Sequence, residues 1–222
     1  MKKLIFPIVF GLMGTLVLIG LSYWQVQRLA QKEAMIAAIE QRVAEADAPI
    51  PLQPTAADDR YMPIVASGIT FEPALHVLTS MQGKGPGYRE VVAFELDDGR
   101  RVLLDRGFIA QSDKDKALSF GPMTVTGNLD WPRESDGFTP EPDLAANIWF
   151  ARDVDAMAKQ LKTEPVLLVA RNVRASPVPL AVPVTVKLPN NHLQYAITWG
   201  LMAAVWLAMS VYLIIRIRRK TA

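Results

Sequence analysis

The chain has 222 residues, of which half are apolar, and a formal net charge of +2. Its positive mean hydropathy is higher than expected for an ordinary soluble domain. It contains no cysteine, which excludes disulfides, thiolate copper sites, iron–sulfur clusters and haem attachment through Cys-x-x-Cys-His.

The first apolar segment, residues 4–24, reads "LIFPIVFGLMGTLVLIGLSYW" and carries no charge. At about 1.5 Å per residue it spans about 31 Å, close to the thickness of a bilayer core of about 30 Å. A cleaved signal peptide is the alternative. It is less favoured because the run is longer than a usual h-region and "GLSYWQVQR" offers no small-residue cleavage site. We therefore predict a transmembrane helix over residues 1–24.

Helical periodicity continues after this span. Apolar residues recur at Leu29, Ile36, Ile39 and Val43 with charged residues on other faces, and no Pro or Gly intervenes. This pattern predicts a helical extension over residues 25–48. The proline-rich stretch 49–54 then ends the helix and forms a linker.

Residues 49–190 are predicted to form an α+β domain. Strand patterns occupy 61–71 and 74–80, separated by a turn at Glu72-Pro73, and "DDG" joins a hairpin of 88–96 with 100–109. Asp98-Gly99 suits a type I′ turn. Further strands are predicted at 123–129, 164–170 and 181–188, and a short helix at 153–161. This content predicts a mainly antiparallel β-sheet or small barrel with short helices.

A second uncharged run from Tyr195 to Ile215 predicts another transmembrane helix over 191–216, followed by a basic tail over 217–222. Tyr23, Trp24 and Trp199 are interfacial aromatics. Basic residues flank the outer ends of both spans and favour the cytoplasmic side, namely Lys2, Lys3, Arg216, Arg218, Arg219 and Lys220. Both termini are therefore predicted to be cytoplasmic and the central domain extracytoplasmic. Without these charges acidic residues outnumber basic ones, which argues against a nucleic-acid partner.

Catalytic signatures are mostly missing from the sequence. Gly-x-Ser-x-Gly, His-Glu-x-x-His, the phosphate-binding Gly-x-x-x-x-Gly-Lys-Ser/Thr and Gly-x-Gly-x-x-Gly do not occur. "GKGPGY" is interpreted as a loop. Of the two histidines, His76 alternates within a strand pattern and is interpreted as a strand residue. The sequence therefore predicts a protein that is not an enzyme.

The other histidine lies in "NNHLQYAITW", at the start of the second span. Asn190 and Asn191 can cap a helix that begins there. His192, Tyr195 and Trp199 then fall at i, i+3 and i+7 on one helix face.

Trp24, Gln25 and Arg28 are predicted to emerge at the same membrane surface as His192. An imidazole can ligate haem iron, aromatic side chains can pack on a porphyrin, and arginine can pair with a propionate. A haem site formed by His192, Trp199, Tyr195, Trp24 and Arg28 is one interpretation, and an ordinary interfacial belt of Trp, Tyr, His and Arg is the other.

Four stretches in order resemble the Surfeit-locus (Surf-one) cytochrome c oxidase assembly family along nearly the whole chain. They are "YWQVQRLAQKEAMIAAIEQRV", "GYREVVAFELDDGRRVLLDRGFIA", "NIWFARDVDAMA" and "NNHLQYAITW". The chain departs from the family in having "SPVPLAVPVTVKLP" where members often carry a glycine-rich turn.

The resemblance implies an assembly factor for haem–copper oxidase that acts when haem a enters subunit I. It implies transient binding of haem a, with His192 as the key residue and Trp199 also involved. Oxidase subunit I, haem a synthase and the lipid bilayer are the implied partners. Arg106, Trp149 and Asp153 match family motifs without a derivable role, although Arg106 and Asp153 are expected to be able to pair.

Two other functions remain open at this stage. One is a scaffold that binds oxidase subunits or haem a synthase without touching the cofactor. The other is a membrane-anchored hydrolase, a hypothesis that rests only on the presence of Ser, His and Asp. "MKKLIF" lacks the Arg- and Ser-rich character of a mitochondrial presequence. We therefore expect a bacterial inner membrane protein with a periplasmic central domain.

Overall fold

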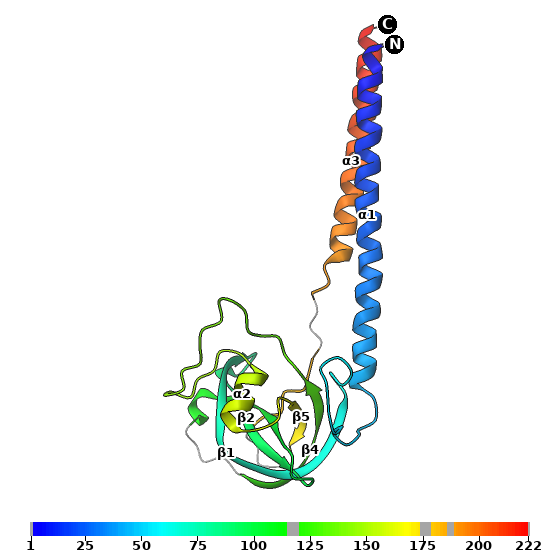
Figure 1. Ribbon diagram of the computed structural model, residues 1–222. Coiled ribbons are helices and arrows are strands. Elements are labelled where there is room, and N and C mark those ends of the chain that lie inside the picture. Colours follow the sequence, from blue (N-terminus) through cyan, green and yellow to red (C-terminus); the bar gives the residue numbers. More distant parts are fainter. Residues whose placement is uncertain (1, 115–119, 174–178, 186–188, 222) are drawn as a thin grey trace. The chain divides into compact units, whose positions relative to one another are not determined.

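The computed structural model describes residues 2–114, 120–173, 179–185 and 189–221 (Figure 1). The chain divides into two compact units. The first combines residues 1–38 with 186–222, and the second comprises residues 39–185. The first unit is helical and the second is built on a β-barrel, in agreement with the predicted α+β content.

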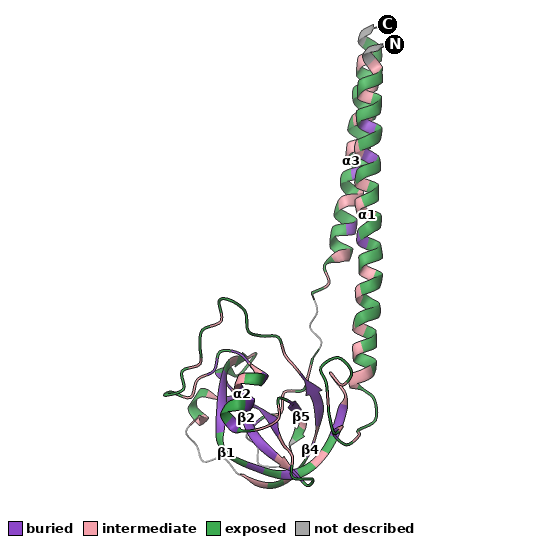
Figure 2. Ribbon diagram, viewed as in Figure 1, coloured by how far each residue is buried: buried purple, intermediate pink, exposed green. Residues whose placement is uncertain are grey.

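The helical unit is formed by α1 (Lys2–Val43) and α3 (His192–Thr221). Both are long and apolar enough, by length and composition, to cross a membrane. Most of their side chains are exposed, as Figure 2 shows. Helix α1 continues without a break to Val43, so the helical period extends beyond the first apolar run but ends before residue 48, the predicted end of the extension.

Small residues let α1 and α3 approach closely as an antiparallel pair. A Cβ added to Gly14 would lie 2.4 Å from Nε1 of Trp206. The same indole nitrogen donates a hydrogen bond to the carbonyl oxygen of Gly11 at 3.2 Å. Nearer the other end, the hydroxyl of Ser22 donates to the carbonyl oxygen of Ala196 at 2.8 Å. These contacts fix the register of the two helices.

The second unit is a closed five-stranded barrel. The strands are β1 (Pro63–Met81), β2 (Gly85–Leu96), β3 (Arg101–Ala110), β4 (Gly121–Asp130) and β5 (Leu167–Val173). Their order around the barrel is β1-β2-β3-β5-β4, and only the β3–β5 pairing is parallel. The alternative of a small barrel is therefore confirmed.

Two helical segments accompany the barrel, the 3₁₀ turn η1 (Gln111–Asp113) and α2 (Val154–Leu161). Alternate residues of β2, β3 and β5 contribute to two apolar clusters. One fills the barrel and includes Phe94, Leu104 and Leu168. The other lies on the outer surface under α2 and includes Leu103 and Met157. Both faces of these strands are therefore buried, which explains their long apolar runs.

One predicted turn is wrong. Residues 61–71 and 74–80 belong largely to a single strand, β1, which runs through Glu72-Pro73. The pairing of β1 with β2 shifts register between Phe71 and Leu75 and then continues. Pro73 cannot donate a ladder hydrogen bond, so it is accommodated at this irregularity without ending the strand.

The β2–β3 hairpin is confirmed, but its turn is not type I′. A type I′ turn needs positive φ at both central residues. In this turn Gly99 has φ of 84° while Asp98 is not among the positive-φ residues, and the amide of Gly99 donates to the carbonyl oxygen of Leu96. The predicted strand at 181–188 is not found over 181–185, and residues 186–188 lie outside the described residues.

Candidate functional site

His192 is the first residue of α3, as the predicted cap position requires. The carbonyl oxygen of Asn191 accepts a hydrogen bond from the amide of Tyr195 at 3.2 Å, which closes the first turn. The predicted side-chain caps are not found among the described residues, and Oδ1 of Asn190 is buried without a hydrogen-bond partner. The helix therefore starts one residue after the predicted 191, with a backbone contact in place of the expected side-chain one.

The imidazole of His192 is bound by a side chain of the other helix. Its Nδ1 lies 2.7 Å from Oε1 of Gln25, and Gln25 is only 8% exposed. An amide oxygen can only accept a hydrogen bond, so Nδ1 carries the proton. In a neutral imidazole the other nitrogen, Nε2, then has a free lone pair. The contact with Gln25 therefore selects the nitrogen of His192 that can bind a metal.

The predicted meeting of the two helix ends is found for His192. Ser22 and Ala196 make their hydrogen bond one turn away from the Gln25–His192 contact, so both contacts belong to one register. Sequence reasoning placed Gln25 at this level but gave it no role. The signal that could have identified Gln25 is the antiparallel pairing of positions 22 and 25 with 196 and 192.

In the described part of the chain, the other predicted site residues do not form one connected group with His192. Arg28 lies over the ring of Trp24, with its guanidinium carbon 6.0 Å from the centroid, and its Nη1 donates to Gln31 at 3.3 Å. Trp24 is 49% exposed and Tyr195 53% exposed, whereas Trp199 is partly buried on α3. The structure thus joins Arg28 to Trp24, and His192 to Gln25. Among the described contacts none joins Tyr195 or Trp199 to Trp24 or Arg28.

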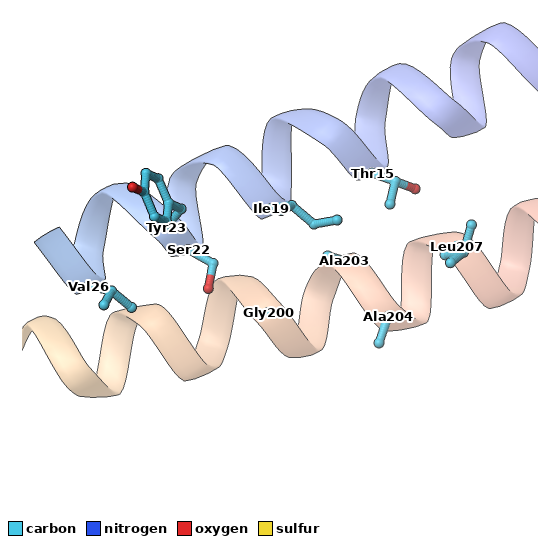
Figure 3. A pocket seen from close by; sticks show the side chains of 9 residues that line it. All are labelled: Thr15, Ile19, Ser22, Tyr23, Val26, Gly200, Ala203, Ala204 and Leu207. Atoms are coloured by element: carbon cyan, nitrogen blue, oxygen red, sulfur yellow. The ribbon is translucent and has the colours of Figure 1, made fainter.

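A groove of about 490 Å³ lies between α1 and α3 (Figure 3). It is lined by Thr15, Ile19, Ser22, Tyr23, Val26, Gly200, Ala203, Ala204 and Leu207. Its volume falls within the usual range of small-molecule sites, and its lining is mainly apolar. Tyr23 and Val26 of the groove are close in sequence to Gln25, whereas neither Gln25 nor His192 is among the lining residues.

The site offers a metal or cofactor one protein donor, the imidazole of His192. A structural zinc site needs about four protein ligands, and within the described ranges no group of three or more His, Asp or Glu side chains could hold a metal ion. A porphyrin supplies four nitrogens itself and needs only axial ligands from the protein. One imidazole with a free Nε2 could supply one such axial ligand.

A buried ion pair lies inside the barrel, and it corrects the expected pairing of Arg106 with Asp153. Arg106 does not pair with Asp153. Its Nη1 lies 3.1 Å from Oε1 of Glu90, and both side chains are completely buried. Asp153 caps α2 by accepting the amide of Ala156 at 3.0 Å. Burial raises the pKa of Glu90 to about 7, the positive charge of Arg106 opposes this rise, and the charge of Asp105 adds to it.

Asp105 lies at the centre of a further ion-pair network outside the barrel. Its Oδ2 accepts from Nε of Arg89 at 2.6 Å and from Nη1 of Arg152 at 3.4 Å. Arg152 also binds both carboxylate oxygens of Glu134. Burial alone would raise the pKa of Glu134, but the hydrogen bonds and charge of Arg152 hold it below its ordinary value. This network joins β2, β3 and the segment before α2.

His76 and Trp149 are part of the barrel wall. Nδ2 of Asn147 lies 3.3 Å from Nδ1 of His76 and donates to the carbonyl oxygen of Ala74 at 2.7 Å. The backbone of Trp149 pairs with β1, because its amide donates to the carbonyl oxygen of His76 and its own carbonyl accepts from Leu78. Both residues therefore have structural contacts in the barrel.

The chain thus combines a pair of apolar helices, which present a single oriented histidine, with a small closed barrel inserted between them in sequence. The SURF1 family model matches residues 12–204, and the chain belongs to the SURF1 family. It is 30% identical to a SURF1-like protein of Monosiga brevicollis over 218 residues, which covers 87% of this chain and 82% of that protein. It is 29% identical to Surfeit locus protein 1 of Rattus norvegicus (83% and 68% covered). A SURF1-like protein of Rickettsia bellii is 24% identical (89% and 86% covered).

Proposed function

We propose that this protein is an accessory factor for the assembly of haem–copper cytochrome c oxidase, and that it carries haem a as a transient cargo for subunit I. The observation that supports this role is the hydrogen bond between Gln25 and His192, which leaves Nε2 of the imidazole free for iron. Trp199 and Tyr195 on α3, and Trp24 on α1, are the proposed aromatic contacts. Arg28 is the proposed partner of a propionate.

A carrier must release its cargo. One protein ligand together with packing against these aromatic side chains provides affinity without a second strong bond, and this favours hand-over. Binding and transfer of this kind make and break no covalent bond in the cargo, so the proposed function is not enzymatic. Haem a synthase, as donor, and oxidase subunit I, as acceptor, are the proposed partners.

The proposed location is the bacterial inner membrane, with α1 and α3 as spans and the barrel in the periplasm. Arg216, Arg218 and Arg219 follow the apolar part of α3, and positive residues of this kind favour the cytoplasmic side. Two apolar helices on either side of the barrel in sequence support a multi-pass arrangement with both termini in the cytoplasm.

The test is titration of the purified full chain in detergent with haem a, followed by absorption spectroscopy. His192→Ala should lose the spectrum of imidazole-ligated haem, whereas His76→Gln, which removes the other histidine of the chain, should keep it. An unchanged stoichiometry and spectrum for His192→Ala would show that this histidine is not the ligand. A native chain that stays colourless with haem a supplied, yet co-purifies with oxidase subunits, would instead support the scaffold function.

A further inference from the structure

The connection from β4 to α2 is far longer than barrel closure requires. Strand β4 ends at Asp130 and α2 begins at Val154. Connections longer than about 12–15 residues without regular structure are uncommon, and they are usually either functional or disordered. In Figure 1 this segment runs outside the barrel before it returns to α2.

Several contacts hold this connection in place, so it is not a loose linker. Near its start, Glu134 binds Arg152 through both carboxylate oxygens. Further along, Asp143 and Ile148 exchange two backbone hydrogen bonds of 2.9 Å. Lys114 donates to the carbonyl oxygen of Ala146 at 2.7 Å. The excursion between these points is therefore short and anchored on both sides.

The outer part of the connection is a tight turn that displays an aromatic ring. Oδ1 of Asp136 accepts the amide of Phe138 at 2.9 Å and the hydroxyl of Thr139 at 3.0 Å. The amide of Asp136 binds Oγ1 of Thr139 at 2.9 Å. This double contact fixes the backbone on both sides of Phe138, whose side chain is 95% exposed. Leu144, 60% exposed, is the second apolar side chain of the segment.

The same segment is purely acidic. Between residues 135 and 148 it contains Asp136, Glu141 and Asp143 and no lysine or arginine. Hydrogen bonds from the amide of Phe138 and from Thr139 hold the pKa of Asp136 below its ordinary value. The exposed ring is therefore flanked by negative charge throughout the physiological pH range. Carboxylates at this position oppose insertion into an anionic lipid surface and favour a basic protein surface.

We propose that residues 135–144, called the Phe138 turn, form a docking element for a partner protein that offers an apolar socket bordered by lysine or arginine side chains. Phe138 fills the socket and the carboxylates pair with its rim. A turn that is ordered before binding loses little conformational entropy on docking, and a central aromatic anchor surrounded by polar groups is typical of a binding hot spot. This inference stands on the barrel unit alone and does not depend on haem binding.

The test begins in cells that produce the full chain together with its own terminal oxidase. p-Benzoylphenylalanine replaces Phe138 in one sample and Leu52, an 81% exposed apolar control, in the other. A discrete crosslinked protein is expected at position 138 and not at position 52. Adducts to lipid, the same products at both positions, or no product at position 138 would overturn the proposal.

Binding of the full chain to the purified crosslinked protein is then measured at low and high salt. Phe138→Ser should weaken binding about tenfold or more while the thermal unfolding midpoint stays unchanged, because the ring is exposed. The triple variant Asp136→Asn, Glu141→Gln, Asp143→Asn keeps the side-chain acceptor of the turn and should remove most of the salt dependence. Unchanged affinity for Phe138→Ser, or unchanged salt dependence for the triple variant, would overturn the proposal.

Discussion

Gln25→Leu removes the hydrogen-bond acceptor of His192 and keeps a side chain of similar size. Gln25 is 8% exposed, so leucine is compatible with its surroundings. A hydrogen bond of this type contributes about 1 kcal/mol net, which changes the ratio of the two imidazole tautomers about fivefold. Loss of a partner that orients a metal-binding histidine typically reduces metal affinity about 10- to 100-fold. We expect a haem a affinity reduced within that range.

Two measurements check this prediction in the full chain in detergent. Titration with haem a gives the affinity, and ¹⁵N NMR of the ring nitrogens of His192 in haem-free protein reports which nitrogen carries the proton. Gln27→Leu is the matched control, because Gln27 is an exposed glutamine of the same helix. Gln25→Glu should retain the Nδ1 proton through a stronger acceptor and lower the reduction potential of bound haem.

The reasoning is refuted if Gln25→Leu binds haem a as tightly as the native chain and His192 keeps its proton on Nδ1. The two proposals on this site can fail separately. If the native chain binds no haem a, the proposed cargo is wrong, while the NMR measurement still decides whether Gln25 sets the tautomer of His192.

Glu90→Gln removes a carboxyl group with a pKa of about 7 in the barrel against an ordinary 4.5. Folded Glu90 keeps its proton to higher pH than the unfolded chain does, so the native chain loses stability as pH rises. As pH rises from 5 to 8, the unfolding free energy of the variant, measured with denaturant, should increase by about 2–3 kcal/mol relative to that of the native chain. A difference between the two chains that does not change with pH would contradict this. Gly14→Leu forces a side chain into Trp206 and should destabilise the helix pair by about 1–3 kcal/mol. Gly20→Leu meets no atom within 4 Å and should leave the thermal midpoint in detergent unchanged; equal shifts would refute the packing argument. Asp153→Ala removes the cap of α2 and should lower the unfolding free energy by about 1 kcal/mol, whereas Asp153→Asn, measured in parallel, should stay near native.

The helices and most of the strands could be predicted from the sequence, because each depends on the pattern of residues within its own segment. The uncharged runs and the 3.6-residue period located α1 and α3. Two asparagines before His192 located the start of α3, and strand patterns located most of the barrel. The prediction of a turn at Glu72-Pro73 was wrong. Proline lacks an amide donor, but the register shift in the pairing of β1 with β2 accommodates it, so the strand continues.

The contacts that matter most for the site depend on distant parts of the chain. Gln25 and His192 are 167 positions apart, and their meeting depends on the register of two helices whose small residues interlock. Arg106 was expected to be able to pair with Asp153. Its actual partner, Glu90, is placed by the bulge between β2 and β3, which a sequence pattern cannot reveal. Such contacts can be predicted only when the register of the helix pair and of the strand pairing is known.

Each of the five described strands has a neighbour on both sides over part of its length, because the sheet closes on itself. Closure therefore limits the edge that another polypeptide could use to extend the sheet, which is a common route to both peptide capture and unwanted aggregation. Side chains on the connections between the strands then become the main features by which another protein could recognise the barrel.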